Sequence, residues 1–322
     1  MKKIAIVGIG RWGKNLIREF SKLAQVKVCV TTGNQKNLKW LRQNYPEVTH
    51  TTDVYQILKD PEIDAVVIAT PISSHFTLTK KALEYKKHVF VEKPLAKTGS
   101  DAQKLIETAK KNRRCLFVGH VFLYNEIFKK IKELHKTESI KYANFEWKKL
   151  GTFDEDIFEN LLSHDLSLNL ELFGMPKKIK LVNKYGLLTP VDRFSLELYF
   201  NKTRRSEITI DRTANYKKKT VMVATQKNSY IWDDNELLKF DKMTQSYKKI
   251  FQSKNTPLYL ECKEFIRNVN AKNYSIDSAI LAGKIANLIS KMPRQEGIFS
   301  SYGPDSRINP KTNKFYYSSV KT

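Results

Sequence analysis

The start of the chain constrains its fold most, because a short apolar strand leads directly into a glycine-rich loop. The loop reads Gly8-Ile9-Gly10-Arg11-Trp12-Gly13, and a helical pattern follows it. In such a loop Gly8 allows a tight turn, Gly10 lets a ligand approach the backbone, and Gly13 lets helix and strand pack closely. We therefore predict a βαβ unit that binds the pyrophosphate of a dinucleotide at the helix N-terminus, with Arg11 and Trp12 beside it.

Apolar strands alternate with amphipathic helical stretches through the first 118 residues. This alternation is typical of a parallel sheet with helices on both faces. Strands are expected at 3–8, 26–30, 65–69, 88–91 and 115–118, and helices at 13–23, 37–44, 55–59, 76–84 and 100–112. The pattern predicts an α/β fold that begins with a Rossmann-type, doubly wound NAD(P)-binding domain over residues 1–120.

The rest of the chain reads as an α+β domain over residues 121–292, with a large and mainly antiparallel open sheet. Strands with alternating apolar residues are expected at 142–148, 179–182, 194–200, 207–211, 220–224, 229–232 and 237–240. Helices are expected at 258–269 and 278–291, and the second should pack back on the first domain. A half-covered sheet leaves one face for a partner, so we expect a homodimer or homotetramer. Residues 293–322 read as an extended tail.

The formal net charge of +24 is scattered along the chain and includes only short runs such as Lys217-Lys218-Lys219. No basic arm or long basic helix concentrates it, so we expect no nucleic-acid partner and no membrane partner. The apolar residues 4–9 are too few for a signal peptide, and no stretch is long enough to span a membrane, which predicts a cytoplasmic protein. The widely separated Cys29, Cys115 and Cys262 read as buried reduced thiols, and the sequence shows no metal-ligand spacing.

The end of the second expected strand bears on the choice of cofactor. An acidic residue there would bind the ribose 2′-hydroxyl of NAD. This chain instead has Thr31 and Thr32 followed by Gly33 and Asn34, with Lys36 close behind. Because no carboxylate would repel a 2′-phosphate, we expect NAD or NADP as cofactor, with a slight preference for NADP.

Further motifs resemble those of the Gfo/Idh/MocA oxidoreductases, the relatives of glucose–fructose oxidoreductase and inositol dehydrogenase. They are residues 69–75 (Ala-Thr-Pro-Ile-Ser-Ser-His), residues 87–96 around Glu92-Lys93-Pro94, and residues 119–125 (Gly-His-Val-Phe-Leu-Tyr-Asn). The resemblance covers roughly residues 1–290. Within the family, the chain is most similar to members of surface-polysaccharide pathways that oxidise UDP-linked amino sugars.

The position of Lys93 supports a chemical role. A lysine at the end of a parallel strand projects from the carboxyl edge of the sheet, where ligands bind in doubly wound folds. There Lys93 can hydrogen-bond the hydroxyl being oxidised and stabilise the developing alkoxide. Glu92 would hold Lys93 or the nicotinamide ribose.

The resemblance implies that Thr70 and Pro71 line the cofactor crevice. It also places His75 beside that crevice, although His75 taken alone favours a packed histidine at a helix start over a chemical participant. By the same resemblance, Tyr124 and Asn125 contact the sugar.

The chain departs from the family pattern at the second catalytic element. The family places an aspartate four residues before a histidine, so that both side chains lie on one helix face. Here the histidine is His164 and the expected aspartate is Asn160, which can accept a hydrogen bond but carries no charge. Neither Glu159 nor Asp165 lies on the same helix face as His164. His164 as catalytic base and His164 as a structural histidine therefore both stay open.

Taken together, these residues and the resemblance imply an NAD(P)-dependent dehydrogenase that moves a hydride between a sugar hydroxyl carbon, such as that of a UDP-amino sugar, and nicotinamide. The catalytic candidates are Lys93, His164 and Asn160. The substrate-binding candidates are Lys93, Tyr124, Asn125 and His164. The alternative is a catalytically degenerate member that binds cofactor and acts as a sensor or assembly subunit.

Overall fold

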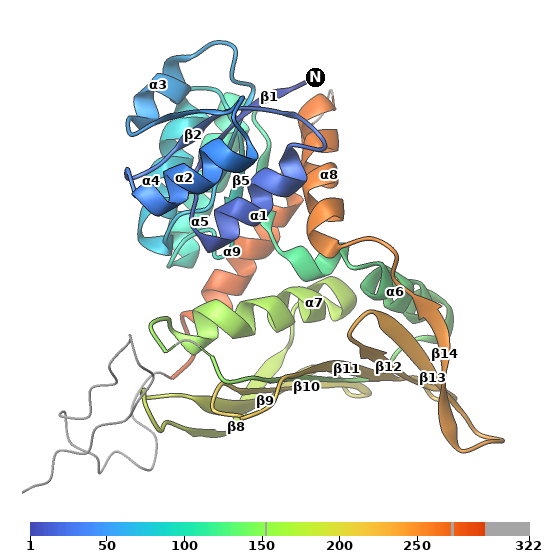
Figure 1. Ribbon diagram of the computed structural model, residues 1–322. Coiled ribbons are helices and arrows are strands. Elements are labelled where there is room, and N and C mark those ends of the chain that lie inside the picture. The colour runs from blue at the N-terminus through green and yellow to red at the C-terminus, as the bar shows by residue number, and fades with distance from the viewer. Residues whose placement is uncertain (152, 272–273, 294–322) are drawn as a thin grey trace, which may run out of the picture.

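The computed structural model describes residues 1–151, 153–271 and 274–293 of the 322-residue chain. Two β-sheets form two layers, with helices around and between them (Figure 1). The tail predicted over residues 293–322 lies, from residue 294 onward, outside the described residues. In the part of the chain that is described, no helix is both long and apolar enough to cross a bilayer.

The first sheet has six strands in the order β3-β2-β1-β4-β5-β6, and every neighbouring pair is parallel. This order confirms the predicted Rossmann-type sheet. The strand order reverses between β1 and β4, and ligands bind outside the carboxyl ends of the strands at such a reversal. The strands are β1 Lys3–Val7, β2 Gln25–Val30, β3 Thr49–Thr51, β4 Ala65–Ile68, β5 His88–Glu92 and β6 Leu116–Gly119. The connecting helices are α1 Arg11–Phe20, α2 Gln35–Asn44, α3 Val54–Lys59, α4 Ile72–Glu84 and α5 Gly99–Asn112.

The second sheet has eight strands in the order β14-β13-β12-β11-β7-β10-β9-β8. Only its β7–β10 pair is parallel among the described pairs, which confirms the predicted, mainly antiparallel sheet. The strands are β7 Tyr142–Lys148, β8 Lys178–Tyr185, β9 Arg193–Asn201, β10 Arg204–Asp211, β11 Lys218–Ala224, β12 Ser229–Asp233, β13 Glu236–Asp241 and β14 Ser246–Gln252.

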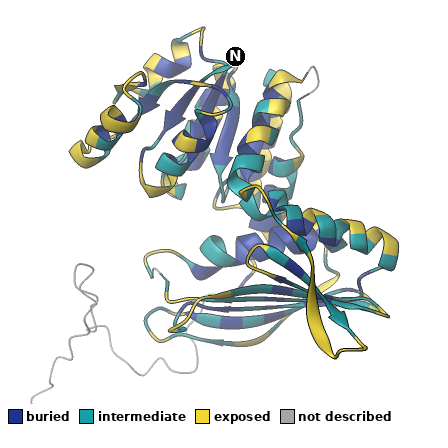
Figure 2. Cartoon of the chain, turned by 45° about the vertical axis from the view of Figure 1, so that its right-hand side comes forward, coloured by how far each residue is buried: buried dark blue, intermediate teal, exposed yellow. Residues whose placement is uncertain are grey.

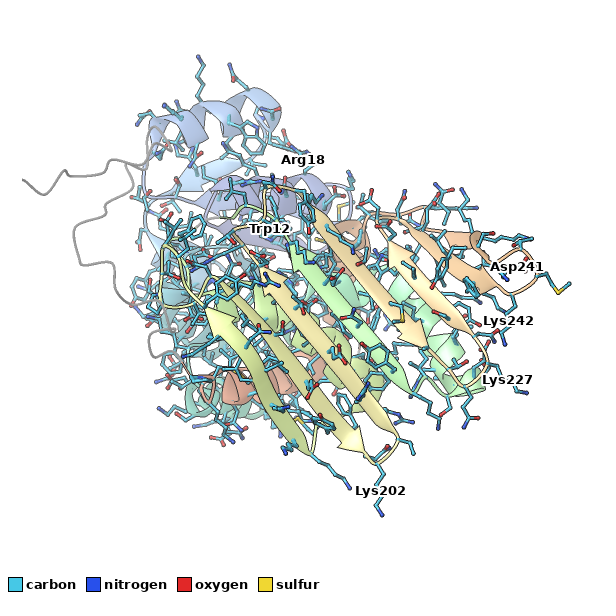
Figure 3. The ribbon with its side chains drawn as sticks, turned by 90° about the horizontal axis from the view of Figure 1, so that it is seen from below. Trp12, Arg18, Lys202, Lys227, Asp241 and Lys242 are labelled. Atoms are coloured by element: carbon cyan, nitrogen blue, oxygen red, sulfur yellow. The ribbon has the colours of Figure 1, made fainter. Side chains whose placement is uncertain are left out.

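One face of the second sheet is covered by helices and the other is open. The helical segments on the covered side are η1 Val121–Tyr124, α6 Glu126–Glu138, η2 Phe158–Leu162 and α7 Ser163–Phe173. Helix α7 lies between the two layers, and residues 163–170 are all buried there (Figure 2). Seen from below, the strands lie in front with no described helix over them (Figure 3). The covered side of this sheet thus faces the first sheet (Figure 1).

The last two helices, α8 Pro257–Asn270 and α9 Asp277–Ile289, return to the first sheet. Phe265 of α8 packs edge-on against Phe20 and Phe90, with ring centroids 5.9 and 5.6 Å away. Helix α9 packs against α5 and β6, and the Ser278 hydroxyl accepts a hydrogen bond from the Val118 amide at 3.0 Å. This confirms the prediction that the final helix packs on the first domain.

Several elements differ from the sequence predictions. Helix α1 begins at Arg11 and not at Gly13, so the glycine loop and the first helical turn overlap. Strands β3 and β14 and helix α6 were not predicted. Strand β3 has three residues and β14 is an almost wholly exposed edge strand, so neither carries an apolar pattern. Cys29, Cys115 and Cys262 are buried and unpaired, as predicted.

Candidate active site between the two sheets

The glycine loop at the N-terminus of α1 has one glycine that is crowded by the protein at each end and an open one between them. A Cβ on Gly8 would lie 2.5 Å from the Ala69 carbonyl oxygen, and one on Gly13 would lie 2.0 Å from that of Gly8. Gly8 also has φ +98°, a conformation that favours glycine. A Cβ on Gly10 would meet nothing within 4 Å. The space over Gly10 therefore fits a ligand, and the free N–H groups of the first turn of α1 suit a phosphate anion.

The two non-glycine residues of this loop that were predicted beside the cofactor lie at the surface. Arg11 and Trp12 are both exposed, and Trp12 donates its indole N–H to the Glu92 carboxylate. This hydrogen bond joins the glycine loop to the end of β5. It brings together two motifs that are 80 residues apart in the sequence.

The two threonines that follow β2 differ in their exposure. Thr31 is buried, and its hydroxyl accepts a hydrogen bond from the Gly33 amide at 3.4 Å. Thr32 is exposed. Residues 31–34 present no carboxylate at the position where a ribose would lie, as the sequence indicated.

Thr70 and Pro71 follow β4, at the carboxyl edge next to the glycine loop. The imidazole of His75 is buried between two carbonyl oxygens, with Nε2 2.7 Å from that of Thr70 and Nδ1 2.8 Å from that of Pro94. Burial lowers the pKa of His75. The ring therefore lies between the turn after β4 and the turn that carries Lys93, and its place beside the cofactor stays a prediction.

Lys93 follows β5 directly and meets the segment that carries the second predicted catalytic element. Its ammonium donates to the Asn160 backbone carbonyl at 2.7 Å and to the Asn160 side-chain oxygen at 3.1 Å. Asn160 lies in η2, a single π-helical turn, and such turns occur often at functional sites. The Asn160 amide oxygen is thus directed at Lys93. Among the described residues it makes no hydrogen bond to His164.

His164, in the first turn of α7, lies against two aromatic rings. Its imidazole stacks on Trp147 of β7, with centroids 5.4 Å apart, and meets the edge of Phe122 of η1 at 5.0 Å. Its Nδ1 is buried without a hydrogen-bond partner among the described residues. Burial first, and the charge of Lys93 next, hold the pKa of His164 well below its usual range. The imidazole is therefore neutral and has a lone pair to offer.

Three further polar side chains lie around this point: two are buried, and the third, Lys219, is half-buried with a buried Nζ. No role was assigned to any of them from the sequence. His120 follows β6, Asp165 lies next to His164, and Lys219 is on β11. Both His120 nitrogens, Asp165 Oδ2 and Lys219 Nζ have no hydrogen-bond partner in the described part of the chain. Burial, with the charge of Lys93, lowers the pKa of His120 to about 3, and burial raises that of Asp165 to about 6. Buried polar groups are normally paired, so this cluster is suited to a polar ligand.

A second cluster lies under the glycine loop. Burial raises the pKa of Glu92 to about 7, against the effect of the Trp12 hydrogen bond. Glu261 of α8 is fully buried, and both its carboxylate oxygens lack a partner among the described residues. Burial, with the charge of Glu92, raises the pKa of Glu261. No sequence pattern pointed to Glu261, because its burial depends on how α8 packs against α1.

The two predicted sugar contacts lie at the start of the second layer. Tyr124 is half-buried and packs on Phe117 with ring centroids 5.6 Å apart. Asn125 is buried, and its side-chain oxygen caps α6 by accepting a hydrogen bond from the Ile127 amide at 2.7 Å. Capping occupies the Asn125 oxygen. A substrate contact by either residue stays a prediction.

In sequence, the first domain of the chain matches known proteins. Residues 2–120 match the GFO_IDH_MocA family model, described as an oxidoreductase family with an NAD-binding Rossmann fold. An uncharacterized oxidoreductase of Escherichia coli, YdgJ, is 33% identical over 150 residues, which cover 42% of this chain and 43% of YdgJ. The myo-inositol 2-dehydrogenase of Thermotoga maritima is 27% identical over 132 residues, 41% of this chain and 40% of that enzyme. The chain thus spans less than half the length of these curated relatives.

Solved structures agree over nearly the whole chain. The UDP-N-acetylglucosamine 3-dehydrogenase GnnA from Acidithiobacillus ferrooxidans superposes with a TM-score of 0.81 at 18% identity, covering 90% of this chain and 96% of GnnA. A levoglucosan dehydrogenase, solved with NADH and levoglucosan, superposes with a TM-score of 0.79 at 15% identity, covering 90% of this chain and 95% of that one. At such identities, the likeness shows that both layers share the fold.

Proposed function

Because the chain belongs to the Gfo/Idh/MocA oxidoreductase family, we propose that it transfers a hydride between a hydroxyl-bearing carbon of a sugar and the nicotinamide of NAD or NADP. A sugar carried on a nucleotide, such as a UDP-amino sugar, is the substrate class we favour. The observation that carries the proposal is the contact of Lys93 with Asn160, which lies just before the helix turn that holds His164. This contact lies at the carboxyl edge of the first sheet.

The side chains of this chain divide the work of proton handling. When bound, the nicotinamide accepts or supplies the hydride. The Lys93 ammonium has three donors, two of which contact Asn160, and it can donate the third to the substrate hydroxyl oxygen. As the hydroxyl loses its proton and its carbon gives up the hydride, Lys93 stabilises the negative charge that develops on the oxygen. His164, held neutral by burial, can take the proton.

The loop at the end of β2 supports NADP at least as well as NAD. No carboxylate stands at residues 31–34, and Lys36 follows in the exposed first turn of α2. A 2′-phosphate would therefore meet hydroxyl, amide and ammonium groups, without repulsion. Titration of the protein with each oxidised cofactor tests this proposal: tighter binding of NADP supports it, and much tighter binding of NAD contradicts it.

The reaction is tested by offering the protein both oxidised cofactors with a panel of UDP-hexoses, UDP-N-acetylhexosamines and free polyols. The expected result is reduced nicotinamide, formed with at least one UDP-linked sugar and lost in Lys93→Ala. Activity on free polyols alone would contradict the nucleotide-sugar substrate class. The absence of any substrate-dependent reduction would contradict the oxidoreductase proposal.

The alternative, a protein that binds cofactor without turnover, is favoured by one observation. Asn160 supplies no charge, and its amide oxygen contacts Lys93 in place of the His164 ring. Asn160→Asp separates the two functions. Turnover that appears only in this variant, while the natural protein binds cofactor equally well, would support the sensor or assembly subunit.

A further inference from the structure

One lysine of the run Lys217-Lys218-Lys219 points into the protein. Lys219 pairs directly with Trp147 across the β11–β7 ladder. It shares its strand face with the buried Val221, which packs in the core under the helices. Its neighbour Lys218 points to the open face and forms an ion pair with Glu146 at 2.5 Å. The alternation of the strand thus separates Lys219 from the solvated lysines beside it.

The ammonium of Lys219 is enclosed by the aromatic residues of the candidate active site. Its Nζ lies 2.9 Å from the ring centroid of Phe122 and 3.8 Å from that of Trp147. These are the two rings that hold His164. The nitrogen is sealed from solvent and has no hydrogen-bond partner among the described residues. Aromatic faces stabilise a cation but leave its three donors unsatisfied.

Charged side chains act on Lys219 without pairing with it. The charges of Asp165 in α7, of Lys93 at the end of β5 and of Lys217, which precedes β11, all affect the pKa of Lys219. Burial lowers the pKa of Lys219, and Asp165 opposes this effect. Lys219 nevertheless forms no ion pair with Asp165 in the described structure. The Lys219 nitrogen therefore lies among charged groups without a hydrogen-bond partner in the described part of the chain, whereas a buried polar group is normally paired.

We infer that Lys219 binds an anionic oxygen group carried on the substrate sugar, either a carboxylate or a phosphate. This inference rests on the proposed function, because it places the ligand beside Lys93 and His164, whose charges or rings lie next to Lys219. The anion would accept the hydrogen bonds that the Lys219 nitrogen lacks, and its charge would favour the ammonium form. The substrate class then narrows to acidic sugars, with one end at Lys93 and the acidic group at Lys219.

Matched sugar pairs test the inference. Glucose is compared with glucuronate and with glucose 1-phosphate, and galactose with galacturonate and galactose 1-phosphate, at saturating oxidised cofactor. For the carboxylate or the phosphate series, we expect kcat/KM to exceed that of the neutral sugar by about 10- to 100-fold, the usual contribution of a hydrogen bond to a charged group. The ratio should fall to near one in Lys219→Met. Lys218→Met, the matched control on the open face, should keep the natural ratio.

Each result has a definite meaning. A natural ratio near one in both series, or an unchanged ratio in a folded Lys219→Met, overturns the inference. If none of these sugars is turned over, the panel of UDP-linked sugars decides the proposed reaction, and the thermal midpoint of the cofactor-loaded protein decides the binding claim. Stabilisation by the acidic sugars in the natural protein and in Lys218→Met, but not in Lys219→Met, supports the anion site. No stabilisation overturns it.

Discussion

His120 is a buried histidine whose titration should be visible in the stability of the protein. Its side chain is 1% exposed, and the groups that act on it include Lys93, while His164 lies nearby in the same cluster. Its folded pKa of about 3 lies below the unfolded value of about 6.5. The stability linked to this difference is therefore fully present above pH 6.5 and is lost as the pH falls toward 3. At pH 5 the loss is about 2 kcal/mol.

The variant His120→Gln should remove this loss. We expect the fall in the free energy of unfolding between pH 7 and pH 5 to be about 2 kcal/mol smaller than in the natural protein. Urea unfolding at the two pH values measures it. The exposed His50 provides the matched control, since His50→Gln should keep the natural pH dependence. An equal fall in His120→Gln and the natural protein would show that His120 is not held neutral by burial.

The roles of some single residues could be predicted from the sequence, and those of others could not. The glycine loop and Lys93 could be placed because each belongs to a local motif at the end of a strand. The role of Lys219 could not be placed, because a strand face becomes known only when the start and register of the strand are known. Asn160 could be identified as a departure, but its contact with Lys93 depends on how η2 meets the end of β5.

At the scale of elements, the turn between β1 and α1 makes a prediction with an internal control. In Gly13→Ala the new Cβ would lie 2.0 Å from the Gly8 carbonyl oxygen, so helix and strand must move apart. We expect a loss of about 1–3 kcal/mol in the free energy of unfolding. In Gly10→Ala the new Cβ meets nothing within 4 Å, and the natural φ of −68° suits alanine.

Gly10→Ala should therefore keep the natural stability within about 0.5 kcal/mol. Its affinity for NAD or NADP should nevertheless fall about tenfold or more, because the methyl group occupies the space for the pyrophosphate. Chemical unfolding and fluorescence titration with reduced cofactor measure the two quantities. Natural affinity in Gly10→Ala would contradict the placement of the pyrophosphate over this loop.

Helices and strands were predicted correctly where their buried residues give the sequence a clear apolar pattern. The first sheet and the bounds of β7 follow from apolar strands, and the return of α9 to α5 follows from its apolar faces. Helix α6 was missed although Ile127, Phe128 and Ile131 have helical spacing and Asn125 caps it. Strand β14 was missed for a physical reason: it lies at the sheet edge with few buried residues.

At the scale of the whole molecule, the open face of the second sheet (Figure 3) should bind a second copy of the chain. Met222, Ile231 and Leu238 are direct neighbours across β11, β12 and β13, and they lie half-buried on this face. Ile231→Glu should place a charge in the centre of this apolar row. We expect a dimer or tetramer for the natural protein and a monomer for the variant, measured by light scattering. Lys202→Glu, at a hairpin end, is the control, and a monomeric natural protein would contradict the prediction.

The central claim is that Lys93, held by Asn160, carries the chemistry where the two layers meet. It is tested most directly by the single-turnover rate of cofactor reduction with the best sugar from the panel, at saturating cofactor and sugar. We predict that Lys93→Gln lowers this rate by about 10²- to 10⁴-fold. Lys97→Gln, at an exposed position four residues away, should keep the natural rate. A Lys93→Gln rate within a few-fold of the natural one would contradict the claim.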